Sequence, residues 1–214
     1  MIKYAFTKVG IGHTDLARYS FFNKVMFKLG PDVFSFNDFE NGILRGNRKA
    51  PFAISSQLSK GDPRLDLAFQ DVDCRIHFAL NCGAKSCPPV KNFTSTNIEE
   101  ELRIVSQAFC EDESQVRVDL DKGTIYLSKI LSWYQEDFGK SKEERLKTVA
   151  GFLRGKKLSD LELLLKKRGE APKVKYNEYD WSTDASDYVP FSNTTVKAAT
   201  NRLLRGISYT STRH

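Results

Sequence analysis

The sequence has few of the residues that mark special classes of protein. Its 214 residues include 4 cysteines, 2 tryptophans and 3 histidines. Four cysteines are too few for a disulfide-stabilised scaffold, so we expect a reducing compartment, the cytoplasm. No apolar run approaches the roughly 18 residues that a membrane span needs. Residues 1–8 also lack the apolar core of a secretory signal. We therefore expect a soluble protein with no membrane span.

Charge is spread along the chain rather than concentrated in one segment. The net charge is +6, with 40% hydrophobic and 28% charged residues, as in soluble globular domains. Basic residues outnumber acidic ones in residues 185–214, a segment rich in Ser, Thr and Asn that we expect to be a mostly disordered tail. No basic stripe interleaved with aromatic residues is present, so we predict no nucleic-acid partner.

Helical and strand patterns alternate along residues 1–184, which we expect to form one domain. Apolar residues at helical spacing predict helices over residues 1–10, 36–44, 64–69, 98–109, 128–138, 143–154 and 159–168. Alternating or short apolar runs predict strands over residues 75–80, 116–120, 124–128 and 174–181, with a further strand over 22–29. The predicted fold is α+β, with several amphipathic helices packed against a small antiparallel sheet and with long loops.

One stretch holds most of the side chains that can do chemistry. Three of the 4 cysteines and one of the 3 histidines lie within residues 74–89. The apolar run Ile76-His-Phe-Ala-Leu80 is typical of a central strand, and it stops at Asn81-Cys-Gly83, where glycine permits a sharp turn. We therefore expect residues 81–89 to form a loop at the end of a central strand, where a rigid frame can present a site.

Residues 75–89, Arg-Ile-His-Phe-Ala-Leu-Asn-Cys-Gly-Ala-Lys-Ser-Cys-Pro-Pro, resemble the signature of the DUF547 family, a domain without an assigned function. Residues 35–46, residues 127–138 and Tyr179-Asp-Trp-Ser182 are similar to the family as well. The resemblance thus covers about residues 1–184. In the family pattern a helix with an Asn-x-Tyr-Asn motif begins upstream of the position of Met1. We expect that helix to be missing here, so that the domain is truncated at its N-terminus.

Two functional hypotheses stay open at this point. The first, which we favour, is a non-catalytic binding or scaffold domain whose cysteine loop and a neighbouring groove bind an unidentified protein or small molecule. The second is a thiol-dependent hydrolase or transferase of papain- or transglutaminase-like type, with Cys82 or Cys87 acting together with His77 and an aspartate, Asp137 or Asp180. In such enzymes the cysteine precedes the histidine, whereas here both cysteines follow it. The oligomeric state is left open.

Several other residues are candidates for the site. Asp137 lies near the end of its predicted helix, where a negative charge opposes the helix dipole unless a cation or donor offsets it. Such local conflicts concentrate at functional sites. The aromatic residues Trp133, Tyr134 and Phe138 are at helical spacing and are predicted to be core rather than ligand contacts. Further candidates, of which the last two are spaced to pair across a helical turn, are Asn81, Gly83, Ser86, Glu40 and Arg45.

Metal and disulfide readings of the cysteine loop are less favoured. Cys74, His77, Cys82 and Cys87 have the atoms that zinc prefers, but their spacings match none of the usual structural zinc pairings. We therefore predict no metal and no other cofactor. A Cys82–Cys87 redox pair is a third alternative, although the motif is not Cys-x-x-Cys and no thioredoxin-like pattern is visible.

Overall fold

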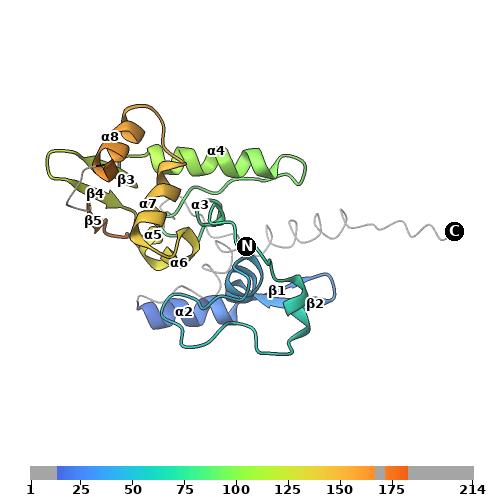
Figure 1. Ribbon diagram of the computed structural model, residues 1–214. Coiled ribbons are helices and arrows are strands. Elements are labelled where there is room, and N and C mark those ends of the chain that lie inside the picture. The colour runs from blue at the N-terminus through green and yellow to red at the C-terminus, as the bar shows by residue number, and fades with distance from the viewer. Residues whose placement is uncertain (1–13, 167–171, 183–214) are drawn as a thin grey trace, which may run out of the picture. The chain divides into compact units, whose positions relative to one another are not determined.

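The computed structural model describes residues 14–166 and 172–182 (Figure 1). The predicted helix over residues 1–10 and the expected domain boundary at residue 184 lie outside these residues. The first elements are α2 (Asp15–Lys24), β1 (Met26–Leu29), β2 (Asp32–Ser35), the π-helix η1 (Asp38–Leu44), the 3₁₀ helix η2 (Pro63–Leu67) and α3 (Ile76–Ala79). They are followed by α4 (Ile98–Glu111), β3 (Val116–Asp119), β4 (Thr124–Leu127), α5 (Lys129–Trp133), α6 (Gln135–Phe138), α7 (Lys142–Ala150), α8 (Gly155–Lys166) and β5 (Lys173–Tyr176).

The described strands form two separate sheets. β1 and β2 are an antiparallel hairpin, and β3 pairs antiparallel with β4, with Val116 opposite Leu127. β5 pairs with β4 in parallel, with Thr124 opposite Lys173. The α+β class is confirmed, but one small antiparallel sheet is replaced by a two-stranded antiparallel sheet and a mixed three-stranded sheet. β5 runs parallel because α5 to α8 carry the chain across before it returns, the kind of crossover that parallel strands require.

The predicted strand over residues 75–80 is wrong. Ile76–Ala79 form the short helix α3, and its first three residues are all buried. The ring of Phe78 packs against Phe109 of α4, with 4.7 Å between the ring centroids. A short apolar run does not by itself distinguish a buried strand from a buried helical turn. The packing of Phe78 against α4 favours the helix, and the local sequence does not reveal that contact.

The predicted strand over residues 22–29 is correct only in its second half. Residues 22–24 end α2, and Met26–Leu29 form β1. Thr14 starts α2, because its side chain accepts a hydrogen bond from the amide of Ala17 at 3.2 Å and so satisfies one of the free amides of the first turn. A capping residue upstream therefore overrides the alternation of aromatic and polar residues.

The remaining elements agree with prediction in position but often differ in type or length. The helix over 98–109 and the hairpin over 116–128 are confirmed. The helix expected over 36–44 is a π-helix, and the one over 64–69 is a 3₁₀ helix. The helix expected over 128–138 is divided at Tyr134 into α5 and α6.

Two further boundaries were predicted incorrectly. α8 begins at Gly155, so Ser159 is not its N-cap; the Ser159 hydroxyl instead donates to the Gly155 carbonyl within the helix. The capping box of the structure is at α7, where the side chains of Ser141 and Glu144 each accept a hydrogen bond from the other's backbone amide. The last strand ends at Tyr176 rather than at residue 181.

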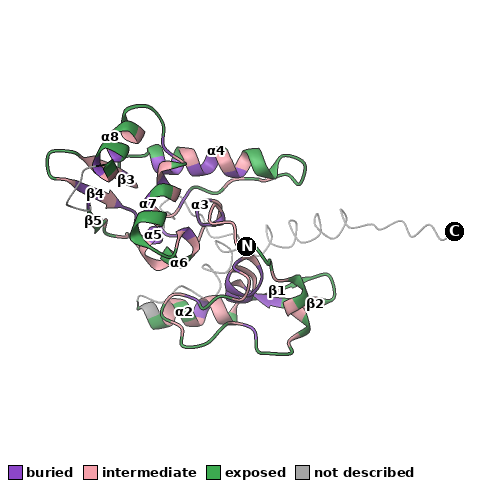
Figure 2. Ribbon diagram, in the orientation of Figure 1, coloured by how far each residue is buried: buried purple, intermediate pink, exposed green. Residues whose placement is uncertain are grey.

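Among the described residues, buried apolar side chains form two clusters. Figure 2 marks the buried positions along the ribbon in purple. The large cluster is built mainly by α3 to α8 with β3 and β4, and its fully buried members include Phe78, Cys110, Val116, Ile125 and Leu161. The small cluster consists of Phe34, Ile43 and Leu58. Leu58 packs so closely on η1 that a Cβ at Gly42 would lie 2.9 Å from its Cγ.

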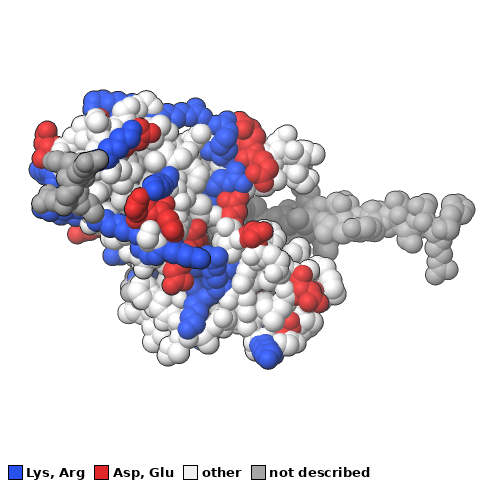
Figure 3. Space-filling model, in the orientation of Figure 1, with Lys and Arg blue, Asp and Glu red and all other residues white. Residues whose placement is uncertain are grey.

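On the face drawn in Figure 3, Lys and Arg side chains lie beside Asp and Glu side chains. None of the helices in the part of the chain that the structure describes has the length and hydropathy needed to cross a membrane.

Gly139, between α6 and α7, has a backbone that only glycine adopts readily. Its φ is +152°, and a Cβ there would lie 2.7 Å from Glu144 Cβ and 2.9 Å from Arg145 N. We expect Gly139→Ala to lower the free energy of unfolding by roughly 1–3 kcal/mol, measured by urea denaturation. The control is Gly30→Ala, which also has positive φ, at +61°, but has open space around it. An equal loss in both variants would contradict the role of close packing.

Candidate functional site

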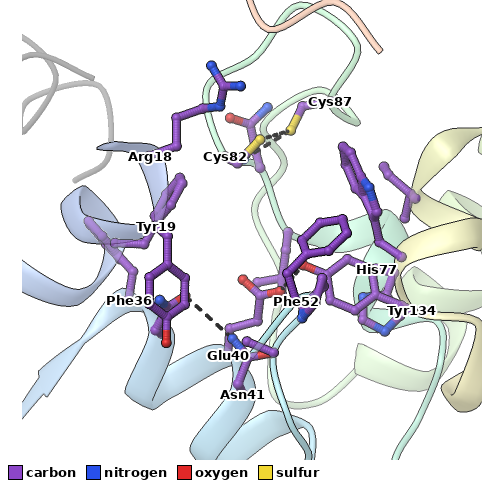
Figure 4. Close-up of a pocket in the computed structure, with 18 of the residues that line it drawn as sticks. Arg18, Tyr19, Phe36, Glu40, Asn41, Phe52, His77, Cys82, Cys87 and Tyr134 are labelled. Atoms are coloured by element: carbon purple, nitrogen blue, oxygen red, sulfur yellow. Dashed lines mark hydrogen bonds between the residues drawn. The ribbon is translucent and has the colours of Figure 1, made fainter. Parts of the chain in front are cut away.

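A pocket of about 400 Å³ is bordered by α2, η1, α3, α5 and the loop that carries Cys82 and Cys87 (Figure 4). Its volume lies within the range of sites that hold small molecules. The two tryptophans of the chain both border it. Much of its wall is aromatic, with contributions from Phe36, Phe39, Phe52, Trp133, Tyr179 and Trp181.

Beside this pocket, His77 forms a hydrogen-bonded pair with Asp137. The distance from His77 Nε2 to Asp137 Oδ2 is 2.8 Å, and both side chains are almost fully buried. Because a carboxylate only accepts hydrogen bonds, Nε2 carries a proton, and in the neutral form of the ring Nδ1 would keep a lone pair. Within residues 14–166 and 172–182, Nδ1 has no hydrogen-bond partner. His77 itself is one of the residues that border the pocket.

The carboxylate of Asp137 is the meeting point of three donors. Arg45 Nε lies 2.6 Å from Oδ2, and Arg48 Nη1 lies 2.7 Å from Oδ1. Burial alone would raise the pKa of Asp137, but the hydrogen bonds from His77, Arg45 and Arg48 outweigh it and hold that pKa well below its usual range. Because the predicted helix is divided at Tyr134, Asp137 lies in the first turn of α6, where a negative charge is favourable, and the expected conflict with the helix dipole is wrong. Two arginines and a histidine instead compensate the charge of a buried carboxylate.

Tyr134 joins the histidine to η1. Its ring stacks on the His77 ring, with centroids 4.0 Å apart and planes at 20°, and its hydroxyl donates to Glu40 Oε1 at 2.6 Å. Burial and the neighbouring Glu40 raise the pKa of Tyr134 well above its usual value. Tyr134 was predicted to be core; it is partly buried and packs against the large cluster, and it also forms part of the pocket wall. The expected pairing of Glu40 with Arg45 is replaced by Glu40–Tyr134 and Arg45–Asp137.

The two cysteines of the loop lie side by side as free thiols. Their Sγ atoms are 2.8 Å apart (Figure 4). The Tyr179 hydroxyl lies 3.1 Å from Cys87 Sγ and 3.4 Å from Cys82 Sγ. The hydrogen bond from Cys82, together with that from Tyr179, lowers the pKa of the Cys87 thiol to about 6 despite its burial. The same pairing and burial raise the pKa of Cys82. Cys87 is therefore the sulfur that ionises first.

The loop residues Asn81, Gly83 and Ser86 all act through backbone hydrogen bonds. The Asn81 side chain donates to the Pro88 carbonyl at 2.6 Å and accepts from the Gly83 amide at 2.9 Å. Gly83 has φ of +87°, which accounts for a glycine at the turn. The Ser86 hydroxyl accepts from the Asp180 amide at 2.8 Å. These residues shape the loop, and of the three only Asn81 borders the pocket.

The structure brings together most of the residues that were candidates for catalysis, but not all of them. Cys82, Cys87 and His77 border one pocket, and Asp137 lies behind the histidine. Asp180 is exposed, and its carboxylate lies 4.0 Å from Lys85 instead of contacting His77. No hydrogen bond in the described parts of the chain joins His77 to either cysteine.

Sequence reasoning missed three residues that shape the site. Tyr179 contacts both thiols, Arg48 contacts Asp137, and Asn37 borders the pocket. Asn37 is 7% exposed, and its Nδ2 has no partner within the described residues. Tyr179 lies in a motif that resembles the DUF547 pattern, which was the one available signal. Arg48 and Asn37 have no distinguishing local pattern.

The comparisons with known proteins address the family. A family model described as "Protein of unknown function, DUF547" matches residues 1–110. The chain belongs to the DUF547 family. The match includes the cysteine loop, His77, Glu40 and Arg45, and it ends before Asp137 and Tyr179. No curated protein and no solved structure matches the chain.

The charge of Asp137 predicts how stability depends on pH. Asp137→Asn leaves Arg45 buried without its partner, so we expect a loss of roughly 3–5 kcal/mol in the free energy of unfolding at pH 7. A carboxylate with a lowered folded pKa stabilises above its unfolded pKa of about 3.9, and loses that effect as the pH falls through the folded value. The difference in the free energy of unfolding between wild type and Asp137→Asn should therefore become smaller below about pH 4.

Chemical denaturation between pH 7 and acid tests this dependence. Asp121→Asn, at an exposed aspartate, is the control and should change the free energy of unfolding by less than about 0.5 kcal/mol. A deficit for Asp137→Asn that stays constant down to low pH would rule out the carboxylate charge as its origin.

Proposed function

We propose that this DUF547 domain is a non-catalytic binding domain whose pocket takes a small aromatic molecule with a neutral amide group. The observation that carries the proposal is the buried Nδ2 of Asn37, which has no partner among the described residues and belongs to a residue that borders the pocket. Leaving a buried donor unpaired costs about 1–3 kcal/mol. A ligand carbonyl that accepts from Nδ2 would remove that cost.

The rest of the wall supports the same ligand chemistry. Aromatic side chains such as Trp133 and Tyr179 offer flat, apolar surface against which an aromatic ring packs well. In the neutral form of His77 that donates from Nε2 to Asp137, Nδ1 can accept an amide N–H. Charged residues of both signs border the pocket, namely Glu40, Arg18 and Lys129, so the wall as a whole does not select for a ligand of either charge. A neutral amide provides the acceptor for Asn37 and the donor for His77 in one group.

Phe52 gives independent support for binding. Its φ is +67°, a left-handed conformation that is unusual for a bulky residue, and it is 85% exposed although it borders the pocket. Such strained residues cluster at ligand sites, where the strain holds a side chain in a useful place. An exposed phenylalanine at the pocket edge is positioned to cover a ligand.

The alternative function, thiol-dependent hydrolysis or transfer, has one observation in its favour, because His77 and both cysteines border the same pocket. Such an enzyme needs a base within hydrogen-bond reach of the nucleophilic sulfur. The partners of Cys87 Sγ are Cys82 and Tyr179, whereas His77 is bonded to Asp137. The binding function is therefore the better supported of the two.

Fluorescence titration tests the binding proposal directly. We expect phenylacetamide to change the emission of Trp133 and Trp181 saturably, since these are the 2 tryptophans of the chain and both border the pocket. Asn37→Asp keeps an oxygen that can accept the hydrogen bond from the Asn41 side chain, but it removes the unpaired Nδ2 donor. It should weaken binding about tenfold, the equivalent of one hydrogen bond.

Two matched variants sharpen this titration. Asn92→Asp makes the same change of charge at an exposed residue outside the pocket and should bind as wild type does. Phe52→Gly relieves the positive φ, so it should weaken binding without lowering the free energy of unfolding. No saturable change with the wild-type protein, or equal affinity in Asn37→Asp, would refute the proposed ligand class.

The alkylation of Cys87 distinguishes the two functions. We expect half-maximal reaction of Cys87 with iodoacetamide near pH 6, because its pKa is lowered to about 6 by Cys82 and Tyr179. His77→Gln keeps a donor for Asp137 and should leave this pH midpoint unchanged. The measurement is mass spectrometry of each cysteine-containing peptide over a range of pH. A midpoint that rises in His77→Gln, with the fold intact, would favour the thiol enzyme instead.

A further inference from the structure

The thiol pair itself is the feature that a binding function leaves unexplained. Cys82 and Cys87 are free thiols, yet their sulfurs are 2.8 Å apart. A disulfide bond is about 2.05 Å long, so a small movement brings these sulfurs to bonding distance. Both residues border the pocket, through which a small oxidant can reach them.

The loop is built so that the two sulfurs stay together. The Asn81 side chain bridges the two ends of the loop, accepting from the Gly83 amide and donating to the Pro88 carbonyl. On the other side the Lys85 amide donates to the Ser182 carbonyl at 2.8 Å. The loop is thus fixed at several points before any bond forms between the sulfurs, so little conformational entropy remains to be lost.

The surroundings of the two sulfurs are unequal. Cys87 Sγ is approached by the Cys82 amide at 3.0 Å, the Cys82 thiol and the Tyr179 hydroxyl at 3.1 Å. The Tyr179 hydroxyl is farther from Cys82 Sγ, at 3.4 Å. Donors that converge on one sulfur stabilise its thiolate, which is the nucleophilic form. The lowered pKa of Cys87 and the raised pKa of Cys82 agree with this geometry.

We propose that Cys82 and Cys87 form a reversible redox site, in which a hydroperoxide oxidises Cys87 and Cys82 then closes an intramolecular disulfide. Bound ligand is not required for this chemistry.

Atoms and electrons balance over two steps. First, the Cys87 thiolate attacks the terminal oxygen of the hydroperoxide; the S–O bond forms, the O–O bond breaks, and the alkoxide or hydroxide leaves and takes up a proton. Second, the Cys82 sulfur, having lost its proton to water, attacks Cys87 Sγ; the S–S bond forms and the S–O bond breaks with release of hydroxide. The two sulfurs together give two electrons to the peroxide. A dithiol reductant returns the pair to its reduced form by thiol–disulfide exchange.

The other cysteines provide internal controls. Cys110 is fully buried in the large cluster, and Cys74 packs against the same cluster. Burial raises the pKa of Cys74 to about 12 and also raises that of Cys110. Neither forms a thiolate at neutral pH, so both should react slowly.

The experiment treats the reduced full-length protein with one equivalent of hydrogen peroxide and quenches it over time for peptide mass spectrometry. We expect a Cys82–Cys87 disulfide, with the loss of two hydrogen atoms, to form at least about tenfold faster than any oxidation of Cys74 or Cys110. Dithiothreitol should restore the starting mass.

Single variants separate the two roles. In Cys82→Ser the reaction should stop at a sulfenic acid on Cys87, which dimedone labels. In Cys87→Ser rapid oxidation should disappear. Tyr179→Phe removes one donor to Cys87 and should slow the first step while still allowing the disulfide to form, which keeps a test available if a cysteine variant does not fold.

Other outcomes overturn the proposal. It fails if Cys87 is oxidised no faster than Cys110, or if dimedone labels Cys82 in Cys87→Ser as rapidly as it labels Cys87 in Cys82→Ser. It also fails if the disulfide joins two molecules instead of closing within one, as non-reducing electrophoresis would reveal. Phenylacetamide binding is measured separately, so failure of the redox site and failure of the binding pocket are distinguishable.

Discussion

The carboxylate of Asp137 is fully buried and charged, and the described fold depends on how that charge is compensated. Arg45 directly follows η1, beside the small cluster, while His77 and Asp137 come from α3 and α6, beside the large one. The two clusters are separate, so this ionic and hydrogen-bonded network is a polar connection between them. Removing one partner of such a pair leaves an uncompensated buried charge, which costs more than the pair itself contributes.

The π-helix η1 explains how one short segment serves both the ionic network and the pocket. Its wide turn is marked by the hydrogen bond from the Arg45 amide to the Glu40 carbonyl at 2.9 Å. Glu40 and Asn41 border the pocket, whereas the Arg45 guanidinium reaches Asp137. π-Helical turns are rare and occur frequently at functional sites. In this chain the turn brings the Glu40–Tyr134 and Arg45–Asp137 contacts next to each other.

The sequence was informative where local pattern decides structure. The helix over 98–109 and the hairpin over 116–128 follow from periodicity and a turn signal, and the cluster of Cys82, Cys87 and His77 was visible as a candidate site. The strand over 75–80 was wrong because packing of Phe78 on α4 determines that segment. The contact of Tyr179 with Cys87 spans 92 residues, and no local pattern encodes a pairing at that separation. The same holds for Arg48 with Asp137.

The position of the thiols in the wall of the pocket has a thermodynamic consequence. Cys82 and Cys87 present one surface to the pocket as dithiol and a different one as disulfide. Any molecule that binds one of these forms more tightly must, by reciprocity, shift the reduction potential of the pair by the same free energy. For a two-electron couple, a tenfold preference corresponds to about 30 mV. Ligand binding in the pocket and the dithiol–disulfide equilibrium of Cys82 and Cys87 are thus thermodynamically coupled.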